Sequence, residues 1–178
     1  MVSRPVPTQY LTAGQDYLDA LVRLGLDPAF LGWAWDVVGS EWRLVLVTSI
    51  VESGGPLAIN RLLFRAYNAE ATPKTISPFV VRVLSHRIIP GGKKSKLWFL
   101  GQAGVLNNPE GAETSDEFYI NSAGQKAVNF QFHFLGMDFE SRNSLLTKWE
   151  AVDRAFAAPV ERQRQWERFK RNVEKLAA

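Results

Sequence analysis

The chain has 178 residues, of which 46% are hydrophobic and 22% charged, and its formal net charge is +3. This length and balance fit one globular domain and exclude a chain that is disordered throughout. The absence of cysteine excludes disulfides, thiol catalysis and thiolate metal sites. The N-terminus lacks the apolar core of a signal peptide, and no apolar run approaches the ~20 residues of a transmembrane helix. We therefore expect a soluble, cytoplasmic protein without membrane contact.

The N-terminal part of the chain predicts an arm followed by a helix. Residues 1–11 contain two prolines and no periodicity, which is typical of a loosely ordered arm. The helix is expected to begin at Thr12, with Gln15 completing a capping box. It should end at Gly25, because glycine adopts the left-handed conformation there at low cost. Its expected core stripe consists of Tyr17, Leu21 and Leu24.

Residues 32–51 predict the hairpin around which the chain is organised. A two-residue type II′ turn at Gly39 and Ser40 would set Asp36 opposite Arg43 as an opposite-charge pair. The second strand of this hairpin is apolar on both faces, which is typical of a strand that is buried on both sides. The alternative is that one apolar face stays exposed for a partner.

The remaining elements follow from helical and alternating spacing. A second helix is expected from Pro56, which suits a first helical position, to Thr72. Strands are predicted over residues 79–85, 96–100, 117–121 and 126–135, and two C-terminal helices over residues 145–156 and 159–178. The last two strands form a hairpin that sets Phe118 opposite Phe130 and Glu117 opposite Gln131.

This order of elements predicts a single α+β domain over residues 1–178. Strands joined as hairpins favour a largely antiparallel sheet of about five to six strands. The N-terminal helix, the mid-chain helix and the two C-terminal helices would pack on that sheet. The pattern recurs in many unrelated folds and carries no function by itself.

One face of the second hairpin carries a polar row that could bind a small polar ligand or serve an enzyme. The row consists of Glu117, Tyr119, Asn129, Gln131 and His133. His133 is one of two histidines, the side chains that titrate nearest neutral pH. The alternative is the solvated outer face of a one-sided sheet, which is the commoner arrangement.

Motifs for metal, nucleotide or serine chemistry are missing from the sequence. His86 and His133 lie far apart, and no ligand spacing typical of zinc or calcium occurs. Neither a phosphate-binding glycine loop nor a G-x-S-x-G motif is present. We therefore expect no metal, no cofactor and no catalytic residues.

The C-terminal segment, residues 159–178, is the candidate for contact with nucleic acid or a partner. It carries six cationic and three anionic side chains, and a cationic helix can neutralise phosphates without reading bases. Trp166 is expected to be partly exposed, where it could anchor a partner. The alternative is a solvated charged helix face. The candidate contact residues are Arg164, Trp166, Arg168 and Arg171, together with Lys93, Lys94 and Lys96 from a loop.

The leading functional hypothesis is a non-enzymatic interaction or accessory domain that contacts another protein. A nucleic-acid-binding module using the C-terminal helix is the first alternative. A small-ligand-binding protein or enzyme using the polar face around His133 is the second.

Overall fold

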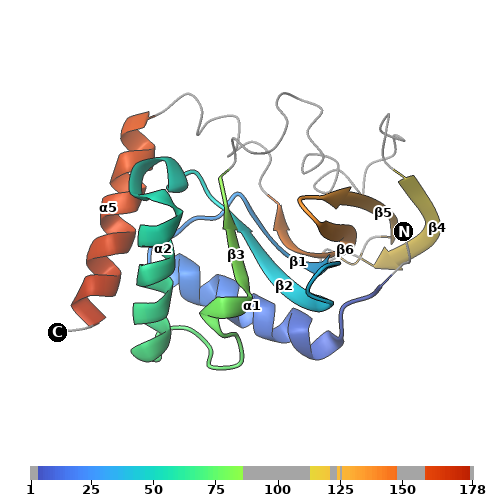
Figure 1. Ribbon diagram of the computed structural model, residues 1–178, viewed down its shortest axis with the longest axis horizontal. Coiled ribbons are helices and arrows are strands. Elements are labelled where there is room, and N and C mark those ends of the chain that lie inside the picture. Colours follow the sequence, from blue (N-terminus) through green and yellow to red (C-terminus); the bar gives the residue numbers. More distant parts are fainter. Residues whose placement is uncertain (1–3, 86–112, 121–123, 125, 148–158, 177–178) are drawn as a thin grey trace.

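The computed structural model describes residues 4–85, 113–120, 124, 126–147 and 159–176 (Figure 1). The helices are α1 (Thr8–Arg23), α2 (Val51–Asn68) and α5 (Pro159–Leu176), with a 3-10 turn η1 (Pro78–Val80). The strands are β1 (Phe30–Asp36), β2 (Glu41–Val47), β3 (Val81–Leu84), β4 (Glu113–Ile120), β5 (Lys126–Phe134) and β6 (Met137–Thr147).

The described strands form one six-stranded sheet in the order β3-β2-β1-β6-β5-β4. The predicted single α+β domain is confirmed, but the predicted largely antiparallel sheet is corrected to a mixed one. β2 and β3 pair in parallel, because α2 carries the chain back to the end of the sheet at which β2 began. The other neighbouring strands pair antiparallel.

The described part of the chain contains three α-helices instead of the four predicted. α1 lies across one face of the sheet, while α2 and α5 lie side by side near β3 (Figure 1). Residues 145–147, predicted to open a C-terminal helix, belong to β6. The sequence prediction missed β6 because it placed Leu135 inside the preceding strand. In the structure, Leu135 and Gly136 form a tight turn between β5 and β6, with φ of 52° and 75°. Residues 148–158 and the predicted strand over residues 96–100 lie outside the described residues.

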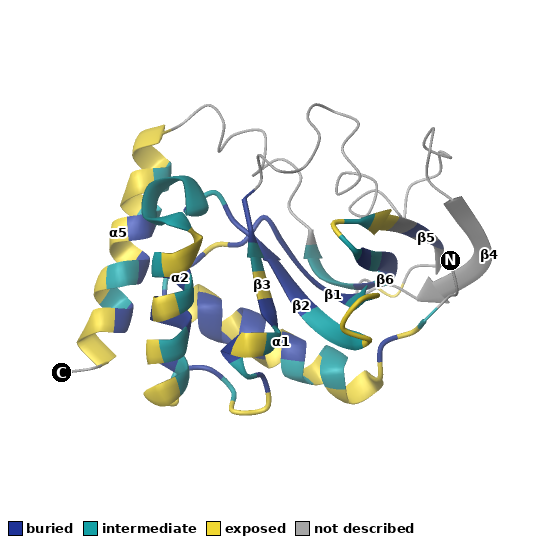
Figure 2. Ribbon diagram, viewed as in Figure 1, coloured by how far each residue is buried: buried dark blue, intermediate teal, exposed yellow. Residues whose placement is uncertain are grey.

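From Leu44 to Val47, strand β2 is buried on both faces, as its pattern predicts (Figure 2). Leu44 and Leu46 belong to the larger core cluster, which joins the sheet to α1, α2 and α5. Val45 and Val47 belong to a second cluster on the opposite face, with Phe139 of β6. The apolar residues of β2 therefore connect two cores, which explains why neither face of this strand is polar.

The hairpin of β1 and β2 pairs two residues away from the predicted register. Asp36 lies opposite Glu41 instead of Arg43, and residues 37–40 form a four-residue turn. The Asp36 carboxylate accepts hydrogen bonds from the amides of Val38 and Gly39 at 3.1 and 3.0 Å, which holds the longer turn. A shift of two residues keeps every side chain on the same face of the sheet, so the residues predicted to be buried do not change.

Helix α1 begins four residues before the predicted start and ends where it was predicted to end. The Thr12 hydroxyl donates back to the Thr8 carbonyl at 3.3 Å, so Thr12 lies inside the helix and does not cap it. Gly25 has φ of 87°, and its amide donates to Val22, which is the expected left-handed stop.

Candidate functional site

The polar row of the second hairpin is only partly in solvent. Asn129 and Gln131 are buried, with 0% and 5% of their surface exposed, whereas the His133 side chain is 56% exposed. The solvated-face interpretation is therefore wrong for Asn129 and Gln131. Both of these residues lie on β5, the strand between β4 and β6.

The pairing of β4 with β5 differs from the prediction. Phe118 lies opposite Val128 instead of Phe130, and Tyr119 lies opposite Ala127, with an irregularity between Thr114 and Phe118. This irregularity also places Glu113, and not Glu117, opposite Gln131. The candidate residues Glu117 and Tyr119 thus remain on the strand next to β5, but in a different register.

Strand β6 supplies polar partners that the sequence prediction missed. Glu140 Oε2 accepts a hydrogen bond from Asn129 Nδ2 at 2.8 Å and lies 2.8 Å from Arg142 Nε. Asn129 Oδ1 accepts from the Arg142 amide at 3.3 Å. Glu140 is 4% exposed, and its buried charge is matched by Arg142 as burial requires. A visible signal was the alternation of apolar and polar residues from Met137 to Glu140.

The N-terminal segment closes over this polar cluster. The Arg4 amide donates to Glu140 Oε1, and the Arg4 guanidinium lies 4.3 Å from the centre of the Trp35 ring. Asn143 accepts from the Val6 amide and donates to the Arg4 carbonyl, both at 3.1 Å. These bonds hold residues 4–6 against β6 and use much of the cluster's hydrogen-bonding capacity within the fold.

His133 has a carboxylate partner, but it comes from β6. Its Nδ1 lies 2.8 Å from Oδ1 of Asp138, the residue opposite it across the strand pair. A carboxylate at this distance orients the imidazole ring and fixes its tautomer. This pair lies beside the tight turn at the end of the hairpin.

The C-terminal helix uses two of the predicted contact residues inside the fold. Trp166 is 9% exposed, so the expectation of partial exposure is wrong; a side chain at Gly54 would collide with its ring. Arg168 Nε donates to the Gly25 carbonyl at 3.3 Å and Asn172 Nδ2 to the Leu24 carbonyl at 3.1 Å. These side chains cap the C-terminus of α1, where a cation also suits the helix dipole.

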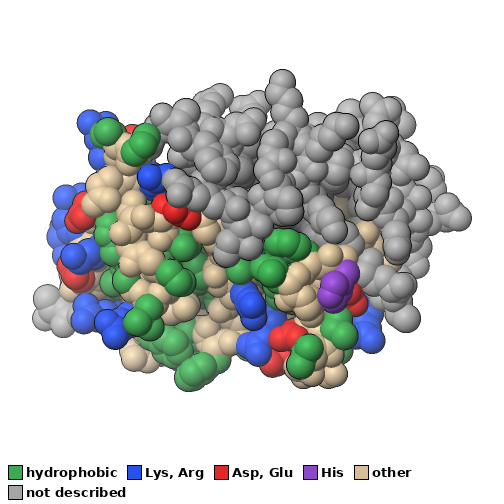
Figure 3. Space-filling model, turned by 45° about the horizontal axis from the view of Figure 1, so that its top comes forward, with side chains coloured by type: hydrophobic (Ala, Val, Ile, Leu, Met, Phe, Trp, Pro, Cys, Tyr) green, Lys and Arg blue, Asp and Glu red, His purple; other side chains and the backbone are tan. Residues whose placement is uncertain are grey.

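The other predicted contact residues are not used in this way. Arg164 lies 3.8 Å from Glu161 with 75% of its side chain exposed, and Arg171 is exposed. Figure 3 shows Lys and Arg side chains along the flank that carries α5, with acidic side chains among them. The loop residues Lys93, Lys94 and Lys96, like His86, lie outside the described residues.

An exposed aromatic residue, not singled out from the sequence, lies between α2 and β3. Phe79 in η1 is 76% exposed, and its ring meets the Phe64 ring edge-on at 4.8 Å between centroids. Arg43 Nη1 donates to the Phe79 carbonyl at 2.6 Å, and Ser77 Oγ accepts from the Phe79 amide at 3.4 Å. Figure 3 shows hydrophobic side chains gathered over the side of the molecule that carries α2.

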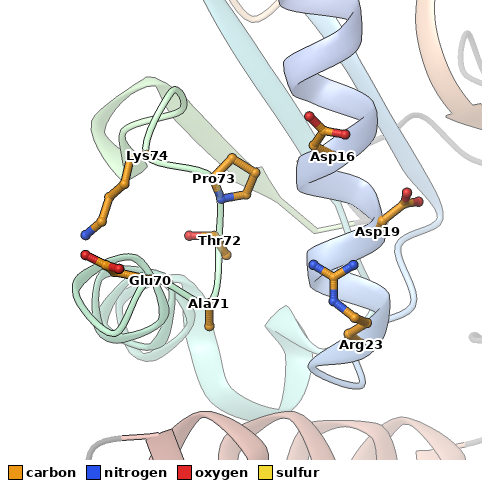
Figure 4. A pocket seen from close by; sticks show the side chains of 8 residues that line it. All are labelled: Asp16, Asp19, Arg23, Glu70, Ala71, Thr72, Pro73 and Lys74. Atoms are coloured by element: carbon orange, nitrogen blue, oxygen red, sulfur yellow. The ribbon is translucent and has the colours of Figure 1, made fainter.

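A cleft of about 430 Å³ lies between α1 and the segment after α2 (Figure 4). Its lining residues are Asp16, Asp19, Arg23, Glu70, Ala71, Thr72, Pro73 and Lys74. In the sequence, Asp16, Asp19 and Arg23 share one polar helix face, but nothing there indicates what lies opposite them.

Two further observations concern the described residues. No group of three or more His, Asp or Glu side chains in this part of the chain could hold a metal ion. None of the described helices is long and apolar enough to cross a membrane.

No family model, no curated protein and no solved structure matches the chain. Any functional proposal therefore has to come from the geometry of its own residues.

Proposed function

We propose that the protein is a non-enzymatic interaction domain that binds another protein through the surface around Phe79. The observation that carries this proposal is that the Phe79 ring is 76% exposed while its backbone is held by Arg43 and Ser77. Aromatic side chains are enriched among the residues that contribute most to protein binding. An aromatic residue whose backbone is already held in place loses less freedom when a partner binds.

The residues around Phe79 indicate the chemistry of the partner. Leu57, 63% exposed, precedes Phe64 on α2 by two helical turns, and Phe64 contacts Phe79. Arg61 and Arg65 are exposed on the same helix, and neither forms an ion pair with another described residue. An apolar surface bordered by unpaired cations suits a segment with apolar side chains and flanking carboxylates.

Selection from a displayed library of random peptides tests this proposal. We expect enriched peptides that combine apolar and acidic residues, with affinities at least about tenfold lower for Phe79→Ser. The matched control is Val38→Ser, since Val38 is 91% exposed in the turn of the first hairpin. The double variant Arg61→Glu, Arg65→Glu should also weaken binding and reduce its dependence on salt.

Two outcomes would contradict the proposal. One is that no peptide is enriched above the background of the library. The other is that the selected peptides bind Phe79→Ser and Val38→Ser equally well, because binding would then take place elsewhere on the molecule.

A further inference from the structure

We propose that the partner of the Phe79 surface binds as an extended segment that adds a strand to the free edge of β3. This inference rests on the proposed function and specifies how the partner is held. β3 ends the strand order of the described sheet, and its neighbour there is β2 (Figure 1). Phe79 lies two residues before β3 begins, so a strand added along this edge passes close to it.

The backbone groups of β3 alternate between β2 and the free edge. Leu84 faces β2, because its carbonyl accepts a hydrogen bond from the Thr48 amide at 3.1 Å. In a parallel pair, the N–H and C=O of one residue point to the neighbouring strand, and those of the next residue point away from it. Arg82 therefore also faces β2 with its backbone, while Val81 and Val83 face the free edge.

Val83 presents both of its backbone groups at this edge. The Val81 amide already donates to the Pro78 carbonyl at the end of η1. The N–H and C=O of Val83 have no partner strand among the described residues, and Val83 is half-buried beside the exposed Arg82. Outward-facing backbone groups of an edge strand are the ones that an extended peptide pairs with when it joins a sheet.

The two faces of β3 differ, and this difference sets the side-chain pattern of the partner. Val81 and Val83 pack in the core cluster that includes α2, and Phe64 of α2 contacts the Phe79 ring. Arg82 lies on the opposite face, is exposed, and forms no ion pair within the described part of the chain. Side chains of an added strand alternate between the same two faces. We therefore expect apolar residues on the α2 side and a carboxylate between them, next to Arg82.

Neither a second copy of β3 nor a helix fits this edge as well. Antiparallel pairing of two β3 strands through Val81 and Val83 of each would set Arg82 directly opposite Arg82. Like charges directly opposite each other destabilise a strand pair. A helix satisfies its own backbone groups and would leave those of Val83 unpaired.

Hydrogen exchange of the full chain, followed by NMR, tests this mode of binding. The probe is a library peptide that binds the wild type and binds Phe79→Ser at least tenfold more weakly. In the free protein we expect the Val83 amide to exchange much faster than the amides of Arg82 and Leu84, which face β2. With saturating peptide, exchange at Val83 should slow at least tenfold.

Methylation of single peptide amides locates the backbone bonds of the probe. Each methyl group removes one N–H and changes neither charge nor side chain. The carbonyls of Val81 and Val83 can accept from two peptide amides that are two residues apart. We expect losses of at least tenfold at two such positions. Little change is expected at the position between them, which is the matched control.

Two variants of β3 provide the corresponding test on the protein. Val83→Pro removes the amide that faces the edge, a place where proline is tolerated in a strand, and we expect peptide binding at least tenfold weaker. Val83→Thr keeps this amide and the branched side chain, and it should bind nearly like the wild type. Circular dichroism checks the fold of both variants.

The results separate this inference from the proposal on which it rests. The strand mode is overturned, while the Phe79 surface keeps its role, if a Phe79-dependent peptide leaves exchange at Val83 unchanged or tolerates methylation at every position. Equal binding by folded Val83→Pro and Val83→Thr has the same meaning. A selection without any Phe79-dependent peptide overturns both proposals. If Val83→Pro does not fold, exchange and methylation still decide. A molecular mass that doubles with rising protein concentration, together with slower exchange at Val83, would identify a second copy as the occupant and overturn the inference.

Discussion

Tyr17 is a polar side chain placed entirely inside the core. It is 0% exposed, and its hydroxyl has no hydrogen-bond partner among the described residues. Burial raises the pKa of Tyr17 far above its ordinary value of 10.0, because the phenolate would lose its hydration. The folded protein therefore keeps this proton at a pH where the unfolded chain loses it.

We expect this difference to lower the stability of the wild type in alkali. The contribution is fully present below about pH 10 and is lost above it, at up to about 1.4 kcal/mol per pH unit, because the unfolded chain then binds fewer protons. Tyr17→Phe should lack this loss and should be at least as stable as the wild type at pH 7. Urea unfolding of both proteins at pH 7 and at about pH 11 measures the difference.

Comparison of the two proteins isolates Tyr17 from the other tyrosines, which are present in both. A fall with pH that is the same in the wild type and in Tyr17→Phe would show that this hydroxyl ionises normally. The high pKa would then be disproved.

The turn between β5 and β6 is an element with an unfavourable residue in it. Leu135 has φ of 52° and Gly136 has φ of 75°, the two left-handed positions of a type I′ turn. Leucine is strained there, and its side chain is 44% exposed, so it gains little from burial.

We predict opposite effects of substitutions at the two turn positions. Leu135→Asn should raise the free energy of unfolding by about 0.5–1 kcal/mol, because asparagine tolerates the left-handed conformation. Gly136→Ala should lower it by about 1 kcal/mol or more, since alanine does not. Denaturant midpoints measure both. Equal effects of the same sign would contradict the assigned turn.

The contact between α5 and the end of α1 is a second element with a testable role. Arg168 donates to the Gly25 carbonyl, whereas Arg171 on the same helix is exposed and makes no such contact within the described part of the chain. We expect Arg168→Ala to lower the free energy of unfolding by about 0.5–1 kcal/mol. Arg171→Ala should stay within about 0.5 kcal/mol of the wild type in the same measurement. An effect of Arg171→Ala as large as that of Arg168→Ala would contradict the capping role.

At the scale of the whole molecule, Asn143 holds the N-terminal segment against the sheet. It bonds both the Val6 amide and the Arg4 carbonyl, across more than 130 residues of sequence. Removing its side chain leaves these buried or half-buried backbone groups unpaired, at a cost of about 1–3 kcal/mol.

We therefore predict that Asn143→Ala loosens the segment more than it loosens the sheet. Hydrogen exchange of the Val6 amide should become much faster, while the amide of Leu46 in the central strand keeps most of its protection. Unchanged exchange at Val6 would show that the segment is held by its other contacts, including the Arg4 stack on Trp35.

The sequence alone determined the local elements and their faces. The apolar side chains on both faces of β2 predicted burial on both sides, and the stripe of Tyr17, Leu21 and Leu24 predicted the buried face of α1. Gly25 marked the end of that helix. Side chains return to the same face every two residues along a strand and about every 3.6 residues along a helix. The predicted faces were therefore right even where the predicted hairpin register was wrong by two residues.

Only the tertiary structure decided which remote groups meet. The parallel pairing of β3, the contacts of β6 and the capping of α1 by Arg168 join residues that no local pattern relates. The same holds for the candidate sites. Asn129 donates a hydrogen bond to Glu140 of another strand. The cleft exists only because the segment after α2 returns beside α1. Local periodicity specifies which face of an element is buried, but not what covers it, because that partner is chosen by packing of the whole chain.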